Sequence, residues 1–238
     1  MQAMTSSSKT IGPPARLATQ ADLETAITFL VERDVMLAPL AGDRPALRRR
    51  PDGFPGLAAI IVAQQVSTAS ATAILSRLID RFPVLSPETI RAAPDTLLRE
   101  AGLSAAKIRT IRATAEACLS GSLPLDRLGS LPSEEADELL TSVSGIGPWT
   151  AEVYRLFCLG DADALPAGDL ALQEAARSLY DLPSRPGRSD FTALAERWRP
   201  LRGAAAHLLW SHYRRLKGRA GIIANPTDER SRQRSRRR

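Results

Sequence analysis

Apolar residues recur at helical spacing along most of the chain. In residues 20–33, Leu23, Ile27 and Leu30 lie at the spacing of one helix face, and Ile74 and Leu78 do the same in residues 68–82. No segment alternates apolar and polar residues long enough to indicate a strand. The pattern predicts an all-α protein, with further helices at residues 56–66, 105–119, 133–143, 148–159, 169–180, 190–198 and 201–217.

Polar residues mark where several of these helices begin. Ser67 and Ser104 each precede a segment with apolar residues at helical spacing and can cap the helix expected there. Ser86 is followed by a proline at the first helical position. Short connections with glycine or proline join the helices. We expect two helical lobes with a cleft between them.

The stretch "SGIGPWTA", residues 144–151, stands between two helical runs. Gly145 and Gly147 suit a tight turn with close backbone approach, and Pro148 suits the first position of the next helix. Such a helix–GxG–helix hairpin leaves backbone N–H groups free at a helix N-terminus, where they can bind phosphate without reading base sequence. The alternative is a plain helix–helix turn.

Composition excludes several classes of site. The two cysteines, Cys118 and Cys158, are far apart and form no metal-binding spacing, so a zinc site, an iron–sulfur cluster and a disulfide framework are not expected. No apolar run reaches the roughly 20 residues that span a bilayer. Neither a membrane partner nor a signal peptide is predicted, and we expect a cytoplasmic protein, nucleoid-associated if bacterial.

Charge is concentrated at one end. The net charge is +6, but the last nine residues hold six arginines and no acid, so the rest of the chain sums to about zero. The tail fits either non-specific phosphate contact or a solubilising segment. We predict an arm at 1–19, a helical domain at 20–222 and a basic tail at 223–238, with arm and tail disordered.

Residues 139–172, "LLTSVSGIGPWTAEVYRLFCLGDADALPAGDLAL", resemble the helix–hairpin–helix (HhH-GPD) DNA glycosylase superfamily. Within it, "GIGPWTA" and "PAGDLAL" are most similar to the 3-methyladenine DNA glycosylases, and the similarity includes "IIVAQQVSTASATAI" and "ERWRPLRGAAAHLLW". The resemblance implies the compact all-helical form, without the N-terminal α/β domain of some relatives.

The resemblance also implies a reaction. It predicts hydrolysis of the N-glycosidic bond of alkylated purines, 3-methyladenine and 7-methylguanine, in damaged duplex DNA. Asp169 matches the family's catalytic acid, and a carboxylate at a helix start could stabilise an oxocarbenium-like sugar and orient water. Trp149 stands where lyases of the superfamily carry a lysine, so a monofunctional enzyme that leaves the strand intact is expected.

Further site residues follow from the same resemblance. Trp210 matches an aromatic wall of the base pocket, whose face attracts a cationic base, and Trp149 and Tyr154 are candidates for the same pocket, with a core role as the alternative for Trp210 and Tyr154. Because base flipping leaves a gap in the duplex, a wedge is needed, and Gln65 matches it best, with Gln64 as a support. The predicted DNA-binding set is Gln64, Gln65, Ser67, Gly145, Ile146, Gly147 and Thr150.

No cofactor is required by this interpretation. The family's hairpin holds a monovalent cation through backbone carbonyls, here those of Thr141, Val143 and Ile146, so a structural sodium or potassium ion is a candidate. A monomer acting on duplex DNA is expected. The alternatives are a glycosylase of the same fold for deaminated or oxidised bases, a non-catalytic DNA-binding hairpin module, and a helical protein–protein scaffold.

Overall fold

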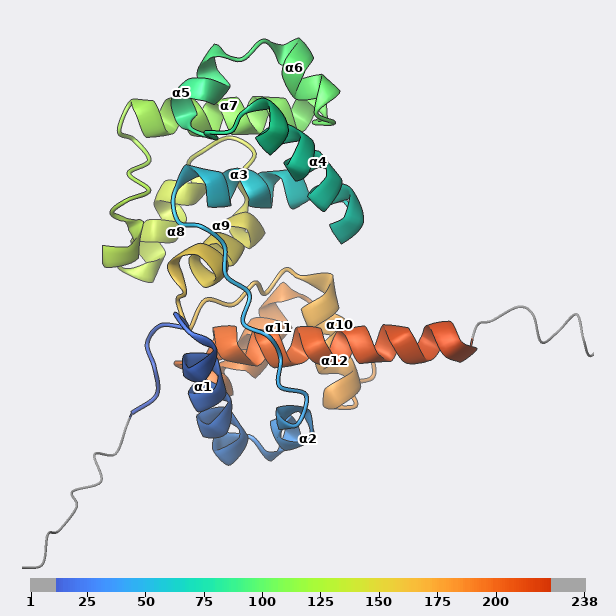
Figure 1. Ribbon diagram of the computed structural model, residues 1–238. Helices are drawn as coiled ribbons and strands as arrows, with labels where there is room; N and C mark the ends of the chain where they lie inside the picture. Colours follow the sequence, from blue (N-terminus) through green and yellow to red (C-terminus); the bar gives the residue numbers. More distant parts are fainter. Residues whose placement is uncertain (1–11, 224–238) are drawn as a thin grey trace, which may run out of the picture.

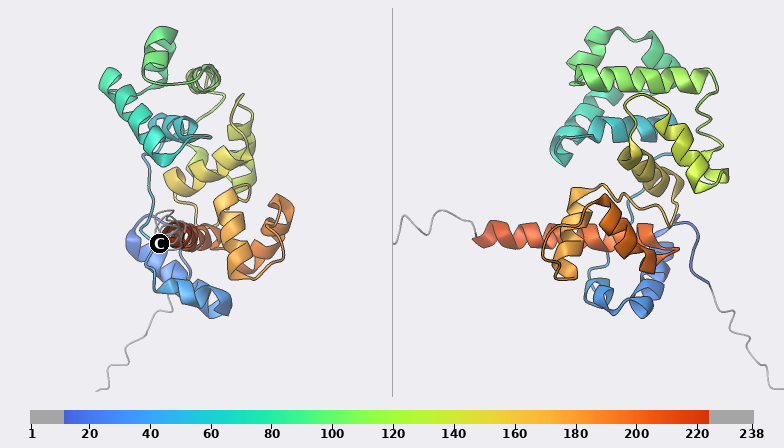
Figure 2. Two further views of the ribbon diagram at one scale, coloured as in Figure 1. Left: turned by 90° about the vertical axis from the view of Figure 1, so that its right-hand side faces the viewer. Right: turned by 180° about the vertical axis from the view of Figure 1, so that it is seen from behind.

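The computed structural model describes residues 12–223. Their regular secondary structure is helical, and one isolated β-bridge, between Arg16 and Asp161, is the only strand-like pairing in that range. The helices form two lobes, one above the other in Figure 1, and the two rotated views of Figure 2 keep them apart. The prediction of an all-α, two-lobed protein is confirmed.

The upper lobe is built around α3, Phe54–Ala63. Every residue of α3 except Pro55 and Ala63 is buried, as expected for a helix that is apolar on all sides. It contacts three of the helices around it, α4, α7 and α9. The other helices of this lobe are α4 (Thr68–Arg81), α5 (Pro87–Ala92), α6 (Asp95–Glu100), α7 (Ala105–Leu119), α8 (Ser133–Thr141) and α9 (Pro148–Tyr154).

The lower lobe joins the two ends of the described chain (Figure 1). The long helix α12, Arg202–Ile223, contacts α1 and α2 from the N-terminal part and α10 from the C-terminal part. Its remaining members are α1 (Gln20–Arg33), α2 (Ala38–Ala41), α10 (Leu170–Leu179) and α11 (Arg188–Ala195). The upper lobe is therefore one continuous stretch of sequence, whereas the lower lobe is made from two.

Two segments connect the lobes. Residues 42–53 lead from α2 to α3, and a π-helical turn, Arg155–Leu159, leads through residues 160–169 to α10. The segments are bonded to each other, because the Arg50 N–H donates to the Phe157 carbonyl at 2.9 Å. Where the lobes meet, Gly203 allows close packing: a Cβ there would lie 2.6 Å from Leu156 and 2.9 Å from the Ala162 carbonyl.

Most expected helix starts are confirmed. The side chains of Ser67, Ser86 and Ser104 each accept a backbone hydrogen bond as N-caps of α4, α5 and α7. The short helices α2 and α6 were not predicted, because a helix of one or two turns shows too little periodicity. Within the described range, no helix has the length and apolarity required to span a membrane.

The N-terminal segment departs from the prediction of a disordered arm over residues 1–19. Residues 12–19 pack on the body of the protein, since Leu17 is fully buried and its N–H donates to the Gly160 carbonyl at 2.7 Å. The prediction is wrong for this part because a single apolar side chain is enough to fix it. Residues 1–11 and the predicted tail from residue 224 onward lie outside the described residues.

Candidate active site

Asp169 is the N-cap of α10. One oxygen of its carboxylate, Oδ1, accepts hydrogen bonds from the N–H groups of Ala171 at 2.9 Å and Leu172 at 3.1 Å. Both donors belong to the first turn of α10, where the helix dipole favours a negative charge. The carboxylate is therefore fixed in direction by its own helix.

Two tryptophans from different lobes also donate to this carboxylate. The indole N–H of Trp149, on α9, lies 3.1 Å from Oδ2, and that of Trp210, on α12, lies 3.3 Å from Oδ1. Asp169 thus receives four N–H donors, drawn from its own helix and from both lobes. Its position and orientation depend on the two lobes being together.

A cavity of about 820 Å³ opens beside Asp169, between the lobes. Residues from the connecting segment, α3, α4, α9 and α12 line it, and Asp169 is the only acid among them. Trp149, Val153 and Phe157 follow one another at helical spacing on the same wall. The cavity is large enough for a nucleobase and carries one carboxylate at its edge.

Trp210 sits in an aromatic cluster at the floor of this cavity. It is 8% exposed, and its ring centroid lies 5.4 Å from that of Phe157 in a tilted arrangement and 6.1 Å from that of His207 at a near-perpendicular angle. These spacings are those of favourable aromatic pairs. The predicted pocket wall is therefore held rigidly, with its remaining face toward the cavity.

His207 supports the cluster as a neutral imidazole. Burial lowers the pKa of His207 to about 4. In the neutral tautomer that fits its contacts, Nδ1–H donates to the Gly203 carbonyl at 2.9 Å, and Nε2 accepts the backbone N–H of Arg48 at 3.4 Å. The histidine thereby ties the connecting segment to α12.

Tyr154 does not belong to this site, contrary to its prediction as a pocket residue. It is fully buried, and its hydroxyl accepts the N–H of Gly53 at 3.0 Å, on a different side of α9 from Trp149 and Val153. Burial raises its pKa above the ordinary tyrosine value. The core alternative holds for Tyr154 because its ring fills space under the start of α3.

The two hairpin glycines have different reasons to be glycine. Gly145 has φ +89°, and a Cβ there would lie 1.9 Å from the Thr110 hydroxyl, so the fold itself requires glycine. Gly147 has φ −95°, and a Cβ would meet no atom within 4 Å. The fold would accept a side chain at Gly147, so the packing of the protein does not require glycine there.

The other hairpin residues face inward. Ile146 and Thr150 are buried, and their N–H groups donate to the carbonyls of Val143 and Gly147. Their backbone N–H groups are therefore used within the hairpin, and contact of these two residues with DNA stays a prediction. Within residues 12–223, the N–H groups of Gly145 and Gly147 donate to no protein atom, which makes both of them candidate phosphate ligands.

The segment between α3 and α4 lies against the hairpin. The Gln64 amide donates to the Thr150 hydroxyl at 2.9 Å and to the Gly145 carbonyl at 3.3 Å, which gives it the predicted supporting place. Gln65 is exposed with a left-handed φ of +55°, and the Ser67 hydroxyl caps α4. A smaller cavity of about 440 Å³ joins Gln64, Gln65 and the hairpin to Asp169.

The three candidate cation ligands lie at the end of α8 and in the hairpin turn that follows it. Thr141 ends α8, and Val143 and Ile146 follow, with the Val143 carbonyl already accepting the Ile146 N–H at 3.0 Å. Among residues 12–223, no cluster of three or more histidine, cysteine or acidic side chains could hold a metal ion. A cation at this turn would thus depend on backbone carbonyls.

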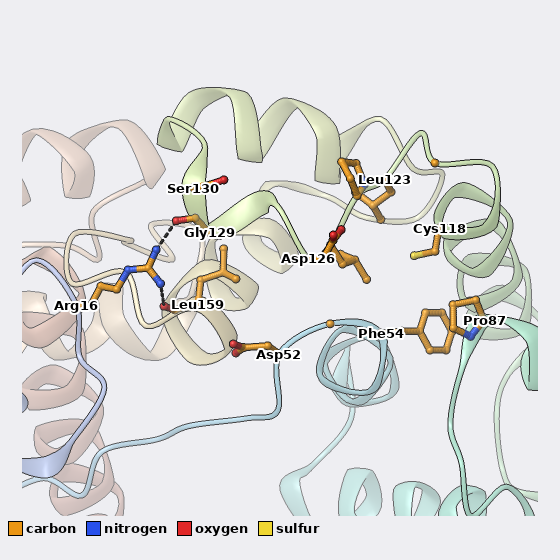
Figure 3. A pocket seen from close by; sticks show the side chains of 14 residues that line it. Arg16, Asp52, Phe54, Pro87, Cys118, Leu123, Asp126, Gly129, Ser130 and Leu159 are labelled. Carbon is orange, nitrogen blue, oxygen red and sulfur yellow. Dashed lines mark hydrogen bonds between the residues drawn. The ribbon is translucent and has the colours of Figure 1, made fainter.

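A second cavity of about 800 Å³ lies on another side of α3 (Figure 3). Three charged residues line it, Arg16, Asp52 and Asp126, and Arg16 donates to the carbonyls of Gly129 and Leu159, drawn as dashed lines in the figure. Cys118 also lines it, and burial raises the pKa of that thiol to about 11, which keeps it protonated and unreactive at neutral pH. No tryptophan is among the residues that line this cavity.

Two residues of the site were missed by the sequence analysis. Phe157 lines the cavity in register with Trp149 and Val153, a spacing of four that could have revealed it. Arg48 lies with its guanidinium 5.3 Å from the centroid of Trp210, and the only sequence signal was the arginine run of residues 48–50.

Comparisons with known proteins agree with this geometry. Residues 58–200, more than half of the chain, match the HhH-GPD superfamily base excision DNA repair protein model. DNA-3-methyladenine glycosylase 1 of Schizosaccharomyces pombe is 36% identical over 156 residues, covering 63% of this chain and 68% of the relative. A probable bifunctional transcriptional activator/DNA repair enzyme of Mycobacterium tuberculosis is 33% identical, covering 78% of this chain and 39% of that protein.

Solved structures show the same likeness. The S. pombe 3-methyladenine DNA glycosylase in complex with abasic DNA superposes with a TM-score of 0.69 at 33% identity. The match covers 79% of this chain and 94% of that one.

Proposed function

The chain belongs to the HhH-GPD superfamily of base excision DNA repair proteins, and from that premise we propose that it is a monofunctional DNA glycosylase for alkylated purines in duplex DNA. The observation that carries the proposal is the Asp169 carboxylate, held between the indoles of Trp149 and Trp210 at the edge of a base-sized cavity. The relatives named as 3-methyladenine glycosylases support the substrate class.

The geometry indicates how the reaction runs. A nucleotide flipped out of the duplex places its base in the cavity over Trp210, with its sugar beside Asp169. As the N-glycosidic bond breaks, positive charge develops on the sugar, and the fixed carboxylate stabilises it and orients the attacking water. The base leaves with the bonding electron pair, and an alkylated purine that is already cationic leaves as a neutral molecule.

The hairpin anchors the DNA in this scheme. The free N–H groups of Gly145 and Gly147 bind a backbone phosphate, and the open space at Gly147 lets the strand approach. Gln65, exposed on its turn, fills the gap that the flipped base leaves. A monovalent cation held by the carbonyls of Thr141, Val143 and Ile146 would add positive charge at the same phosphate.

The strand is expected to stay intact after base release. Strand cleavage by this superfamily's lyases needs an amine that forms a Schiff base with the sugar. No lysine is among the residues that line the two cavities next to Asp169, and Trp149 donates its N–H to the carboxylate. The product is then an abasic site, formed by a monomer.

The test is base release from methylated duplex DNA by the full-length native protein and by Asp169→Asn. Asparagine preserves the N-cap, so the variant should fold and bind DNA. Release of 3-methyladenine or 7-methylguanine that is lost in Asp169→Asn supports the proposal. Equal release by both proteins would show that another group does the chemistry, and binding without release of any alkylated purine would favour a different lesion or a non-catalytic DNA-binding module.

A further inference from the structure

One face of the Trp210 ring is already covered by a cation. The Arg48 guanidinium lies 5.3 Å from the ring centroid, within the range of a cation–π contact, and Arg48 and Trp210 both line the cavity. A flipped base that stacks on Trp210 must share this face with Arg48 or displace its side chain.

A hydrogen bond to α12 fixes the backbone of Arg48 relative to the Trp210 ring. Its N–H donates to Nε2 of His207, which lies one helical turn before Trp210 on α12. The histidine is itself fixed through the Gly203 carbonyl. The same helix therefore carries the ring and anchors the residue whose side chain lies over it.

The Arg48 side chain has no other fixed partner. Among residues 12–223, no side chain or carbonyl accepts a hydrogen bond from its guanidinium, whereas the neighbouring Arg49 pairs with Asp52 at 3.6 Å. Burial and the charge of Arg214 lower the pKa of Arg48, and Asp169 opposes this shift. The charge of Arg48 is thus directed at the cavity and is not neutralised elsewhere.

We propose that Arg48 is a specificity-determining residue that disfavours cationic bases relative to neutral ones, because its guanidinium occupies the cation-attracting face of Trp210. This inference rests on the proposed function and concerns how the charge of a base changes its excision relative to other bases. In DNA, 7-methylguanine carries a positive charge and hypoxanthine does not. A cationic base meets both a displaced cation–π contact and like-charge repulsion, and a neutral base meets only the first.

The experiment compares the full-length native protein with Arg48→Gln on one duplex that carries either base. We expect Arg48→Gln to raise the ratio of kcat/KM for 7-methylguanine over hypoxanthine by about tenfold, the size of one cation–π or screened charge contact. Arg48→Lys keeps the charge and should keep the native ratio. The matched control is Arg49→Gln, which removes a charge from the same segment and the same cavity wall but not from the face of Trp210.

A ratio that is unchanged or falls in Arg48→Gln would overturn the inference. An equal fall in both rates would do so too, because it would assign Arg48 to phosphate binding. A shift of the same size in Arg49→Gln would show that only the general charge of the segment matters, which also contradicts it.

Binding separates this inference from the proposed function. Duplexes with a 2′-fluorinated sugar at the 7-methylguanine or hypoxanthine position resist bond cleavage, so their Kd values report recognition without chemistry. The ratio of the two Kd values should move about tenfold toward the cationic base in Arg48→Gln. If the native protein releases neither base, the proposed function fails while this ratio still decides on Arg48, and an unchanged ratio overturns the inference.

Discussion

Two cavities of almost equal volume, about 820 and 800 Å³, lie on different sides of the buried helix α3. In the one shown in Figure 3, the guanidinium of Arg16 is turned into the wall and bonded to backbone carbonyls. In the other, the Asp169 carboxylate accepts the N–H of Trp210, and the Arg48 guanidinium lies over the ring of Trp210. Volume does not distinguish the two cavities, but the Asp169 cavity alone of the two has a carboxylate bonded by two tryptophans.

The two cavities also differ in what builds them. The Arg16 cavity is lined by the upper lobe and by segments bonded to it, whereas the Asp169 cavity takes residues from both lobes. Only the second depends on how the lobes meet. Substitutions in the Asp169 cavity should therefore change base release, whereas substitutions in the Arg16 cavity should change only the free energy of unfolding.

The largest effect is expected at Asp169. Asp169→Asn removes the negative charge that faces the developing sugar cation, and base release should fall by about a thousandfold or more, the range seen when a fixed electrostatic group is lost. DNA affinity should stay within about twofold of native because the cap and the hairpin remain. Single-turnover base release and fluorescence anisotropy would measure the two. A variant with more than a tenth of native activity would contradict the role of this carboxylate.

Acidification should weaken the protein through His207. Its pKa is about 4 when folded, below the ordinary value of 6.5, so the unfolded chain binds more protons between these values and stability is lost as pH falls from 6.5 to 4. The loss amounts to about 3 kcal/mol. Urea unfolding at several pH values should show a smaller loss in His207→Gln, which cannot titrate. If the free energy of unfolding changed with pH equally in the two proteins, His207 would already be charged in the folded state.

Trp210→Phe should separate the ring from its N–H group. The phenyl ring keeps most of the packing with Phe157 but loses the donor to Asp169 and part of the attraction for a cationic base. We expect base release to fall about tenfold with little change in Tm. Phe54→Leu in the other cavity should do the opposite, lowering the free energy of unfolding by about 1 kcal/mol without changing base release. Loss of base release in Phe54→Leu together with native base release in Trp210→Phe would place the base site in the Arg16 cavity instead.

The mouth of the Asp169 cavity offers a finer comparison within the hairpin. Gly147→Ala has free space and an ordinary φ, so it should fold normally and lose about threefold to tenfold in DNA affinity through one weakened phosphate contact. Gly145→Ala should instead lower Tm, because its Cβ collides with Thr110. Thermal unfolding and anisotropy on the same samples distinguish them. Native DNA affinity in Gly147→Ala would remove this glycine from the interface.

The smallest effect is expected at Asp126, in the Arg16 cavity. Asp126→Asn removes a carboxylate that lines a cavity of similar size, and base release should stay within about twofold of native, as for a surface substitution. A tenfold change would show that the two cavities communicate through α3.

The sequence predicts the local features of this site well. Asp169 as a helix cap, the turn at Gly145 and the serine caps all depend on neighbours within a few residues, and these are confirmed. For Tyr154 the sequence left a pocket and a core role open, and the core role holds because its ring is fully buried on another side of the helix from Trp149 and Val153. The bonds from Trp149 and Trp210 to Asp169, and the place of Arg48 over Trp210, join distant segments and become visible only once the lobes are packed.

The division of the lower lobe between the two ends of the chain has a consequence for biosynthesis. A ribosome completes residues 54–159 while α1 and α2 still wait for α12, so the upper lobe is the first unit that can fold. Docking of α12 onto α1 joins segments that are far apart in the sequence and has to wait for α12 to be made. A nascent chain therefore carries its hairpin well before it carries Asp169 between two tryptophans, and the site is complete only after Trp210 has been added.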